Sequence, residues 1–254
     1  MEVISLLSKS KLTVVMLAAL MLTGCGNKEE VLVDTKPNEA LAHSEETPKP
    51  ESSEAPTQIV KKDFFIPMEI PSGVQSIIIG NSYPKDADPN IISLNDLRLL
   101  NIKYYGFDDR VHEDGAMIVN KDVAEEVGDI FKELYEKKYP IQKVNLIDDY
   151  NSVDLKSMMA NNTSAFCYRT IEGTDVLSNH SFGRAIDINP LMNPQVLKDG
   201  SVYPSKASKY ADRNKSEKGM IKKGDDCYNA FISRGWEWGG DWNSTKDYQH
   251  FEKR

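Results

Sequence analysis

Two short motifs far apart in the chain constrain its folding most, because together they supply the donors for a single metal site. The first is SNHSFGRAID, residues 178–187, which contains His180 and Asp187, and the second is DYQH, residues 247–250, which ends in His250. Two imidazoles and one carboxylate hold a catalytic zinc ion while leaving a fourth position for water. The chain has only four histidines, and two lie in these motifs. A shared ion therefore requires the two segments to fold side by side.

The residues around Asp187 predict how the first half of this site is built. If residues 184–189 form a strand, Asp187 faces a cleft while Ile186 and Ile188 enter the core. Gly183 lets the backbone turn tightly just before the strand, so that the preceding histidine and Asp187 can reach one ion.

The second motif predicts a neighbouring strand through His250. Asp247 lies three residues earlier, and side chains three apart cannot point the same way from a regular strand. We therefore expect Asp247 at a bend before this strand, where it can contact a water molecule without binding the ion. Spacing alone leaves a second interpretation open, because a histidine in a half-buried strand is more often a hydrogen-bonded core residue than a ligand. The other histidines are not expected in the site: His112 is interpreted as structural, and His43 has no expected role.

The N-terminus is predicted to be a targeting segment. Two lysines precede an apolar stretch, residues 12–22, that is too short to span a bilayer and is typical of a secretory signal. The LTGC sequence ending at Cys25 resembles the bacterial lipobox, so residues 1–24 are interpreted as a lipoprotein signal peptide and Cys25 as the lipidated residue. An ordinary cleaved signal with an incidental cysteine is the alternative. The protein is expected outside the cytoplasmic membrane, anchored to it by the lipid on Cys25.

Residues 25–62 are predicted to form a solvated tether. Between residues 26 and 57 the chain has seven glutamates, four prolines and no aromatic residue, so little apolar surface is available to offset the entropy of ordering. Eight acidic residues against three lysines give this stretch a charge of −5, out of −9 after residue 24. The remainder is mildly acidic, and no basic cluster suggests a nucleic acid or an anionic lipid surface, so no nucleic-acid partner is expected.

Residues 63–254 are long enough for one domain with its own core. Apolar residues recur at helical spacing between residues 123 and 134, which predicts a helix capped by Asn120 and ended before Pro140. The other expected elements are strands at 141–147 and 163–169 and helices at 153–159 and 225–234, the last stopping at Gly235. The mixture predicts an α+β domain with a small central antiparallel sheet and flanking helices.

The motifs together carry a family resemblance. SxHxxGxAxD at residues 178–187, WEWGGDW at 236–242 and DxxHF at 247–251 follow one another as in the zinc D-alanyl-D-alanine carboxypeptidase and L-alanyl-D-glutamate endopeptidase family, which the chain resembles from about residue 90 to its end. These peptidoglycan peptidases share a fold with the hedgehog signalling domain. The resemblance implies a hedgehog/DD-peptidase-like domain with one catalytic Zn²⁺.

Carried over residue by residue, the resemblance implies a role for each site residue. His180, Asp187 and His250 hold zinc, and Asp247 is the general base. This chemistry is reasonable in itself, because zinc lowers the pKa of a bound water towards about 7 and a nearby carboxylate can then take its proton. Arg169 matches the arginine that polarises the scissile carbonyl and stabilises the oxyanion. Without the resemblance, Arg169 would be interpreted as a surface or salt-bridging residue.

The supporting residues have more than one interpretation. Ser178 matches a residue that orients the zinc ligands or the substrate. Trp236, Trp238 and Trp242 are either core aromatics at a glycine bend or a wall of the substrate cleft, and Trp238 is our candidate for a substrate contact. Asp241 is interpreted as a turn residue, with a hydrogen bond to a metal-binding histidine as the alternative.

The state of the two cysteines and the substrate subsite are not determined by the motifs. Cys167 and Cys227 can form a disulfide, closing a loop of about 60 residues, or remain buried thiols. Only eight residues separate Arg169 from Ser178, and none is a glutamine. Some relatives that cut between L-alanine and D-glutamate have a longer segment there with a substrate-contacting glutamine. The substrate subsite is therefore not predicted.

The leading hypothesis is a monomeric, lipid-anchored zinc peptidase of peptidoglycan stem peptides, which removes a terminal D-alanine or cuts an internal bond. One alternative is a zinc-stabilised binding or signalling domain without turnover, and another is a peptidase of free dipeptides or small peptides. Asp247 and Arg169 favour the enzyme, because a binding domain needs neither a base nor an electrophile beside an open metal position.

Overall fold

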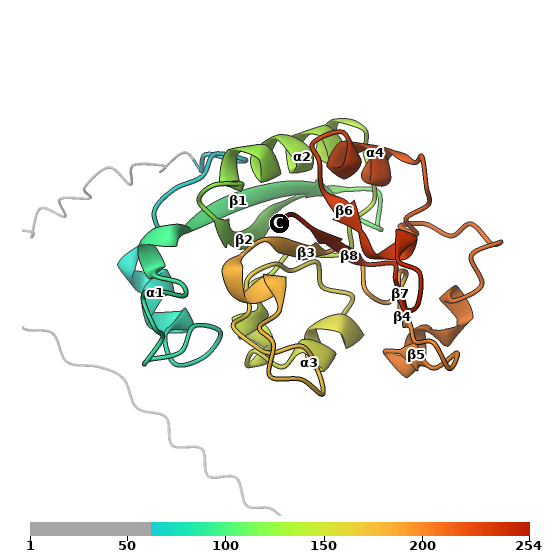
Figure 1. Ribbon diagram of the computed structural model, residues 1–254. Coiled ribbons are helices and arrows are strands. Elements are labelled where there is room, and N and C mark those ends of the chain that lie inside the picture. The colour runs from blue at the N-terminus through green and yellow to red at the C-terminus, as the bar shows by residue number, and fades with distance from the viewer. Residues whose placement is uncertain (1–61) are drawn as a thin grey trace, which may run out of the picture. The chain divides into compact units, whose positions relative to one another are not determined.

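A long hairpin forms the largest sheet of the computed structural model, which describes residues 62–254 (Figure 1). Strands β1 (Leu97–Tyr105) and β2 (Val111–Asn120) pair antiparallel along nearly their whole length. The odd-numbered Leu97 and Leu99 pack in one apolar cluster and the even-numbered Leu100, Ile102 and Tyr104 in another. The hairpin thus separates two cores. No helix or strand was predicted for residues 97–120.

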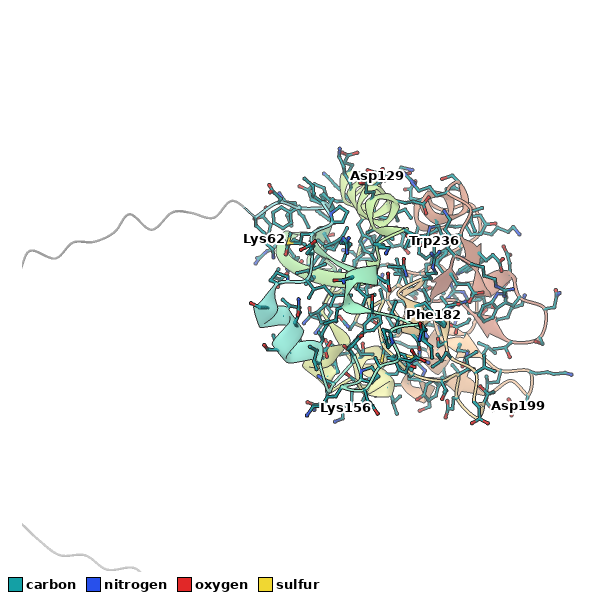
Figure 2. All side chains as sticks on the ribbon, turned by 60° about the vertical axis from the view of Figure 1, so that its left-hand side comes forward. Lys62, Asp129, Lys156, Phe182, Asp199 and Trp236 are labelled. Atoms are coloured by element: carbon teal, nitrogen blue, oxygen red, sulfur yellow. The ribbon has the colours of Figure 1, made fainter. Side chains whose placement is uncertain are left out.

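Helix α2 (Ala124–Glu136) covers one face of this hairpin and confirms the predicted helix. Its buried apolar residues pack against β1, while Asp129 points outward, as Figure 2 shows. The predicted cap was wrong. Asn120 is the last residue of β2, and its side chain accepts a bond from the Asp122 N–H (3.0 Å) and donates to the carbonyl of Phe182 (2.9 Å), while Val123 precedes the helix.

The central sheet brings the two metal motifs together. Its strands β3 (Ala185–Asp187), β8 (His250–Glu252) and β6 (Glu237–Trp238) lie in the order β3-β8-β6, all antiparallel, with Asp187 opposite His250. Ile186, as predicted, is fully buried, and so is its neighbour Phe251, which stacks on Phe231 at a centroid distance of 4.0 Å. Apolar packing therefore holds the register that aligns the donors.

A third sheet places Asp247. Strand β4 (Gln195–Val196) lies between β5 (Val202–Tyr203) and β7 (Lys246–Asp247), and Gln195 pairs with Asp247. The predicted bend at Asp247 was therefore misplaced: Asp247 ends a short strand, and the bend occupies the next two residues. Because β7 and β8 belong to different sheets, the chain changes direction between them.

The strands predicted at 141–147 and 163–169 are not regular strands. Only isolated bridges occur there, including Val144 with Thr163 and Ser164 with Asp187. In the second segment, successive backbone N–H groups donate to carbonyls of different parts of the chain. The pairs are Thr163 to Lys143, Ser164 to Asp187, Phe166 to Ile118 and Cys167 to His180. A chain that crosses several elements in this way forms no continuous ladder.

The predicted helices at 153–159 and 225–234 are confirmed as α3 (Asp154–Met159) and α4 (Asp226–Ile232). Asp225 caps α4 by accepting the Tyr228 N–H at 2.8 Å, and Gly235, with φ +79°, follows its end. The remaining helical elements are α1 (Ser72–Ile78), η1 (Leu94–Asp96), η2 (Ile147–Tyr150), η3 (Asn179–Phe182), η4 (Ser205–Tyr210) and η5 (Gly239–Asp241). The α+β prediction is thereby confirmed.

The two cysteines of the folded part and the N-terminal segment were the remaining subjects of prediction. Cys167 and Cys227 are both free and buried, so they form no disulfide. Within residues 62–254, no helix has the length and apolar character needed to cross a bilayer. The signal peptide, Cys25 and the predicted tether up to residue 61 lie outside the described residues.

We predict that Gly183→Ala destabilises the fold more than Gly173→Ala. Both glycines have positive φ, +65° and +76°, and a left-handed alanine costs about 1 to 2 kcal/mol. A Cβ at Gly183 would also lie 2.5 Å from the backbone nitrogen of Asn120, whereas nothing lies within 4 Å at Gly173. Urea unfolding should show the larger loss at Gly183, and equal losses would contradict the close contact.

Candidate metal centre

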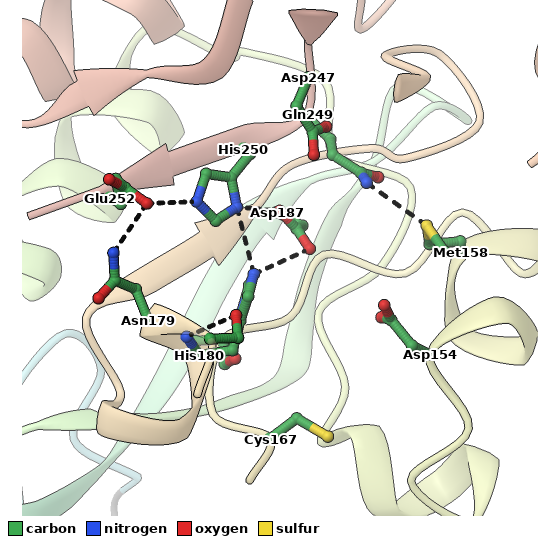
Figure 3. A network of polar contacts seen from close by, with 12 residues as sticks. Asp154, Met158, Cys167, Asn179, His180, Asp187, Asp247, Gln249, His250 and Glu252 are labelled. Atoms are coloured by element: carbon green, nitrogen blue, oxygen red, sulfur yellow. Dashed lines mark hydrogen bonds and ion pairs between the residues drawn. The ribbon is translucent and has the colours of Figure 1, made fainter. Parts of the chain in front are cut away.

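Three donor atoms converge between β3, β8 and η3, as Figure 3 shows. His180 Nε2 lies 3.2 Å from Asp187 Oδ2 and 3.3 Å from His250 Nδ1, and His250 Nδ1 lies 3.1 Å from Asp187 Oδ1. All three side chains are buried. Residues from both motifs thus form one compact donor set, as the sequence predicted.

Hydrogen bonds on the far side of each imidazole fix which nitrogen faces the centre. His180 Nδ1 lies 2.6 Å from the carbonyl oxygen of Ala165, and His250 Nε2 lies 3.1 Å from Glu252 Oε2. A carbonyl oxygen can only accept, so His180 carries its proton on Nδ1. The Glu252 carboxylate likewise accepts from His250. In the neutral tautomers that these bonds select, both inner nitrogens carry the lone pair that a metal-binding histidine requires.

The spacing of the donors fits a tetrahedral ion. Zinc bonds of about 2.0 to 2.1 Å at tetrahedral angles place neighbouring ligand atoms about 3.3 Å apart. The two histidine nitrogens lie 3.3 Å apart, each lies 3.1 to 3.2 Å from a different oxygen of Asp187, and one ligand atom from each residue lies within 4.8 Å of the other two. Two nitrogens, one oxygen and a fourth direction without a protein ligand suit Zn²⁺. The donor set therefore fits the ion that the resemblance implied.

Electrostatics in the centre favour positive charge. Burial would raise the pKa of Asp187, but His180 and His250 hold it well below its ordinary value. Burial lowers the pKa of His250, yet Asp187 and Glu252 raise it to about 10. Hydrogen bonding to His250 keeps the pKa of Glu252 at about 2, so this carboxylate is ionised. A buried site of this kind is suited to a cation.

Glu252 was missed by the sequence analysis. It is buried, and its carboxylate also accepts from Asn179 Nδ2 (2.8 Å) and from Arg254 Nε (3.1 Å). Its position two residues after His250 on one strand, and hence on the same face, was the available signal. Asp241, considered for this role, instead pairs with Lys223 and accepts from Tyr228.

Asp247 lies beside the donors with one oxygen unpaired. Its Oδ2 accepts from Gln195 Nε2 at 3.1 Å, whereas its buried Oδ1 has no hydrogen-bond partner. Burial raises the pKa of Asp247 to about 7, with Asp187 and Asp154 adding to the rise and His250 opposing it. A carboxyl group with this pKa can both accept and release a proton near neutral pH.

The side chain of Arg169 forms an ion pair with an acidic residue. Its guanidinium pairs with Asp154 at the start of α3 (2.8 Å), and its buried Nε has no partner. Burial raises the pKa of Asp154 and Arg169 lowers it. The side-chain hydroxyl of Ser181 holds the Arg169 backbone, accepting from its N–H (2.9 Å) and donating to its carbonyl (2.7 Å). Arg169 is thus a salt-bridging residue, and Asp154 is a partner that the sequence analysis missed.

The two predicted substrate contacts lie inside the protein. The Ser178 hydroxyl accepts the His180 N–H at 3.3 Å, so this buried side chain orients the ligand-bearing turn. Trp238 is 6% exposed, packs against Phe251 and donates its indole N–H to the carbonyl of Tyr248 at 2.9 Å. Its position is that of a core aromatic, and nothing in it supports a substrate contact.

The other tryptophans and His112 occupy different surroundings. Trp242 is partly exposed and lies 5.4 Å from the His250 ring, so it is the tryptophan beside the donors. Trp236 is in the core and donates to Glu126 at 2.7 Å. His112 stacks on Tyr104 and does not belong to the donor cluster, in line with its predicted structural role.

Comparison with known families agrees with this geometry. Residues 172–253 match a family model described as D-alanyl-D-alanine carboxypeptidase. This part of the chain is similar to that peptidase family. The matched peptidase segment contains all three metal donors, Asp247 and Glu252, and begins three residues after Arg169. Neither the curated proteins nor the solved structures contained a match to the chain.

We predict that Glu252→Gln weakens Zn²⁺ binding about tenfold or more, because the outer partner of a metal-binding histidine fixes its tautomer and raises its basicity. Glu237→Gln is the matched control, since Glu237 is exposed and lies directly opposite Glu252 on the adjacent strand. Calorimetric titration with Zn²⁺ and thermal unfolding of both variants separate affinity from stability. Equal affinities would show that Glu252 does not support the site.

Proposed function

We propose that the protein is a zinc-dependent peptidase that cleaves peptidoglycan stem peptides. The observation that carries this proposal is the compact, buried set of two imidazoles and one carboxylate that could hold a metal ion, with the unpaired carboxylate oxygen of Asp247 beside them. The family match over residues 172–253 supports a peptidase. The substrate and the metal are the finer parts of the proposal.

His180, Asp187 and His250 are the residues that would hold the ion. A Zn²⁺ ion bound there supplies Lewis-acid chemistry, acidifying water and polarising the scissile carbonyl. Asp247 Oδ1 accepts the proton that the attacking water loses as its oxygen bonds to the carbonyl carbon. Asp247 then releases this proton to the amide nitrogen as the C–N bond breaks, so that the amine leaves neutral. Gln195 holds the other oxygen and keeps the carboxylate oriented.

Arg169 is proposed to stabilise the negative charge that develops on the carbonyl oxygen. Asp154 holds its guanidinium in place, and the buried, unpaired Nε–H leaves one donor available. A preorganised donor of this kind contributes about 3 kcal/mol to catalysis. The residues of the site would thus supply a base, the metal donors and a group that stabilises the oxyanion.

The unpaired oxygen of Asp247 favours an enzyme over a metal-stabilised binding domain. A buried acceptor without a partner costs about 1 to 3 kcal/mol of stability. A domain that used its ion only for folding would gain nothing from that cost. Catalysis explains it, because a base must keep one oxygen free for the proton it receives.

Location and assembly form a further part of the proposal. The apolar stretch at residues 12–22 and the LTGC sequence support export and lipidation at Cys25. The enzyme would then act outside the cytoplasmic membrane as a monomer, close to the peptidoglycan it cleaves.

Digestion of purified peptidoglycan and of synthetic stem peptides tests the activity. We expect cleavage that a chelator abolishes and added Zn²⁺ restores, with products identified by mass. Released D-alanine would identify a carboxypeptidase, and a new amino terminus on D-glutamate would identify an endopeptidase. Zinc binding without any cleavage would instead support the binding-domain alternative, and cleavage of free dipeptides alone would support the small-peptide alternative.

We predict that Asp247→Asn lowers kcat by at least about a hundredfold, the usual contribution of general acid–base catalysis, while leaving the zinc content unchanged. Asp241→Asn is the control, because this exposed acid lies in the same C-terminal stretch but pairs with Lys223. An Asp247→Asn variant that binds zinc and retains full activity would remove Asp247 as the base.

The pH profile should report the same group. Asp247 acts as a base only when ionised, so kcat/KM should fall as the pH drops through its pKa of about 7. A bound cation stabilises the carboxylate, so the acid limb should lie at or below this value. The limb should vanish in the residual activity of Asp247→Asn, and an acid limb clearly above pH 7 would contradict the assignment.

A further inference from the structure

A groove with a volume of about 730 Å³ lies outside the metal centre. Its walls come from the loop between β1 and β2, the segment after α2, the end of α3, the turn after β3, η4 and the residues before α4. None of the metal donors, Asp247 or Arg169 lines it. This volume lies in the range of sites for small organic ligands, about 300 to 1,000 Å³. The groove is therefore large enough for a ligand of several residues.

Lysines dominate the charge of this groove. Lys143, Lys206, Lys209 and Lys218 line it, with Glu217 as the one acidic residue. Residues 198–223 contain eight Lys and Arg against three acids, whereas the rest of the described chain has 17 against 27. This basic stretch was not singled out in the sequence analysis. The net charge does not reveal these basic residues, because acidic residues outnumber basic ones in the rest of the described chain.

Two of these lysines are available to a ligand. Lys143 and Lys206 form no ion pair with any acidic side chain of residues 62–254. The other two lysines of the groove have contacts within the protein. Lys218 pairs with Asp109, and Lys209 lies 4.5 Å above the ring of Tyr210. The groove thus has two uncommitted positive charges at its edge.

The wall between these lysines is held in shape by polar side chains, of which Asn161 and Asn193 are buried. Asn161, 5% exposed, accepts the Leu191 N–H at 2.9 Å, and Arg213 donates to the Met192 carbonyl at 3.0 Å. Asn193 holds the same turn by donating to the carbonyl of Gly219 at 2.9 Å. A groove whose backbone is already fixed loses little entropy when a ligand binds.

The remaining lining indicates the class of ligand. Apolar side chains of Phe107, Met159, Leu191, Met192 and Tyr210 contribute to its surface. The carboxylates of a bound ligand can pair with the lysines, while apolar side chains of the same ligand pack against the apolar lining of the groove. A phosphate-rich polymer carries few apolar groups and would leave this surface unsatisfied. We propose that the groove binds an acidic peptide through its carboxylates.

Helix α3 connects the groove to the metal centre. Asp154, its first residue, pairs with Arg169, and Met159, its last, lines the groove. A six-residue helix is only about 9 Å long, which three extended peptide residues can span. A stem peptide can therefore place a carboxylate in the groove while another bond lies near the metal donors. Naming the peptide as a stem rests on the proposed function, whereas the preference for acidic peptides does not.

Binding is tested with the full chain carrying Asp247→Asn, so that the peptide is not consumed. The probes are a labelled L-Ala-D-Glu-L-Lys-D-Ala-D-Ala peptide, the same peptide with its carboxylates amidated, and a glycerol phosphate oligomer. Lys143→Gln with Lys206→Gln should weaken binding of the acidic peptide about fivefold, the sum of two exposed ion pairs. The amidated peptide should bind weakly to both proteins.

Lys132→Gln with Lys198→Gln is the matched control, because it removes the same charge from exposed lysines outside the groove. An equal loss in this control, no loss in the groove variant, or tighter binding of the glycerol phosphate oligomer would overturn the proposal. Binding is measured by anisotropy without cleavage, so a protein that binds but never hydrolyses would disprove the proposed function and leave the groove intact. In the active protein, the groove variant should raise KM for the acidic peptide and leave kcat and zinc content unchanged.

Discussion

The pairing of Asp187 with His250 across β3 and β8 is the constraint on which the rest of the site depends. The Asp187 N–H donates to the carbonyl of Ser164, on the side away from β8. Asp187 and His250 are therefore a non-hydrogen-bonded pair of the antiparallel strands. Side chains approach most closely in pairs of this kind. A register shift of one residue would turn one donor to the opposite face. Buried Ile186 and Phe251, the next pair along, oppose such a shift.

The polar groups around this pair act as a connected unit. Ala165 and Glu252 direct the two imidazoles inward, and Ser178 fixes the turn that carries His180. Removing one member leaves others buried without partners, which is costly in a low-dielectric interior. The centre is thus preorganised by the same hydrogen bonds that hold β3, β8 and η3 together.

Predictions were correct where the feature depends on residues of one segment, and wrong where it depends on contacts between segments far apart in the chain. Helix α2 was predicted because its apolar spacing is contained in one segment, and the donors were predicted because few residue types can bind a metal. The 163–169 segment was mispredicted as a strand because its alternation reflects contacts with several elements. Trp238 was expected at the substrate, but its core position depends on Phe251 and Tyr248, which only folding brings beside it.

The sequence by itself determined the chemistry that the site can perform: two imidazoles, a carboxylate and a candidate base, with the alternation that turns Asp187 away from the core. The tertiary structure alone decided the partners of those groups. It placed Glu252 behind His250, Asp154 against Arg169 and the lysines of residues 198–223 around one groove. The physical reason is that residue type and periodicity are local properties, whereas hydrogen-bond partners and charge clusters arise from long-range contacts between segments.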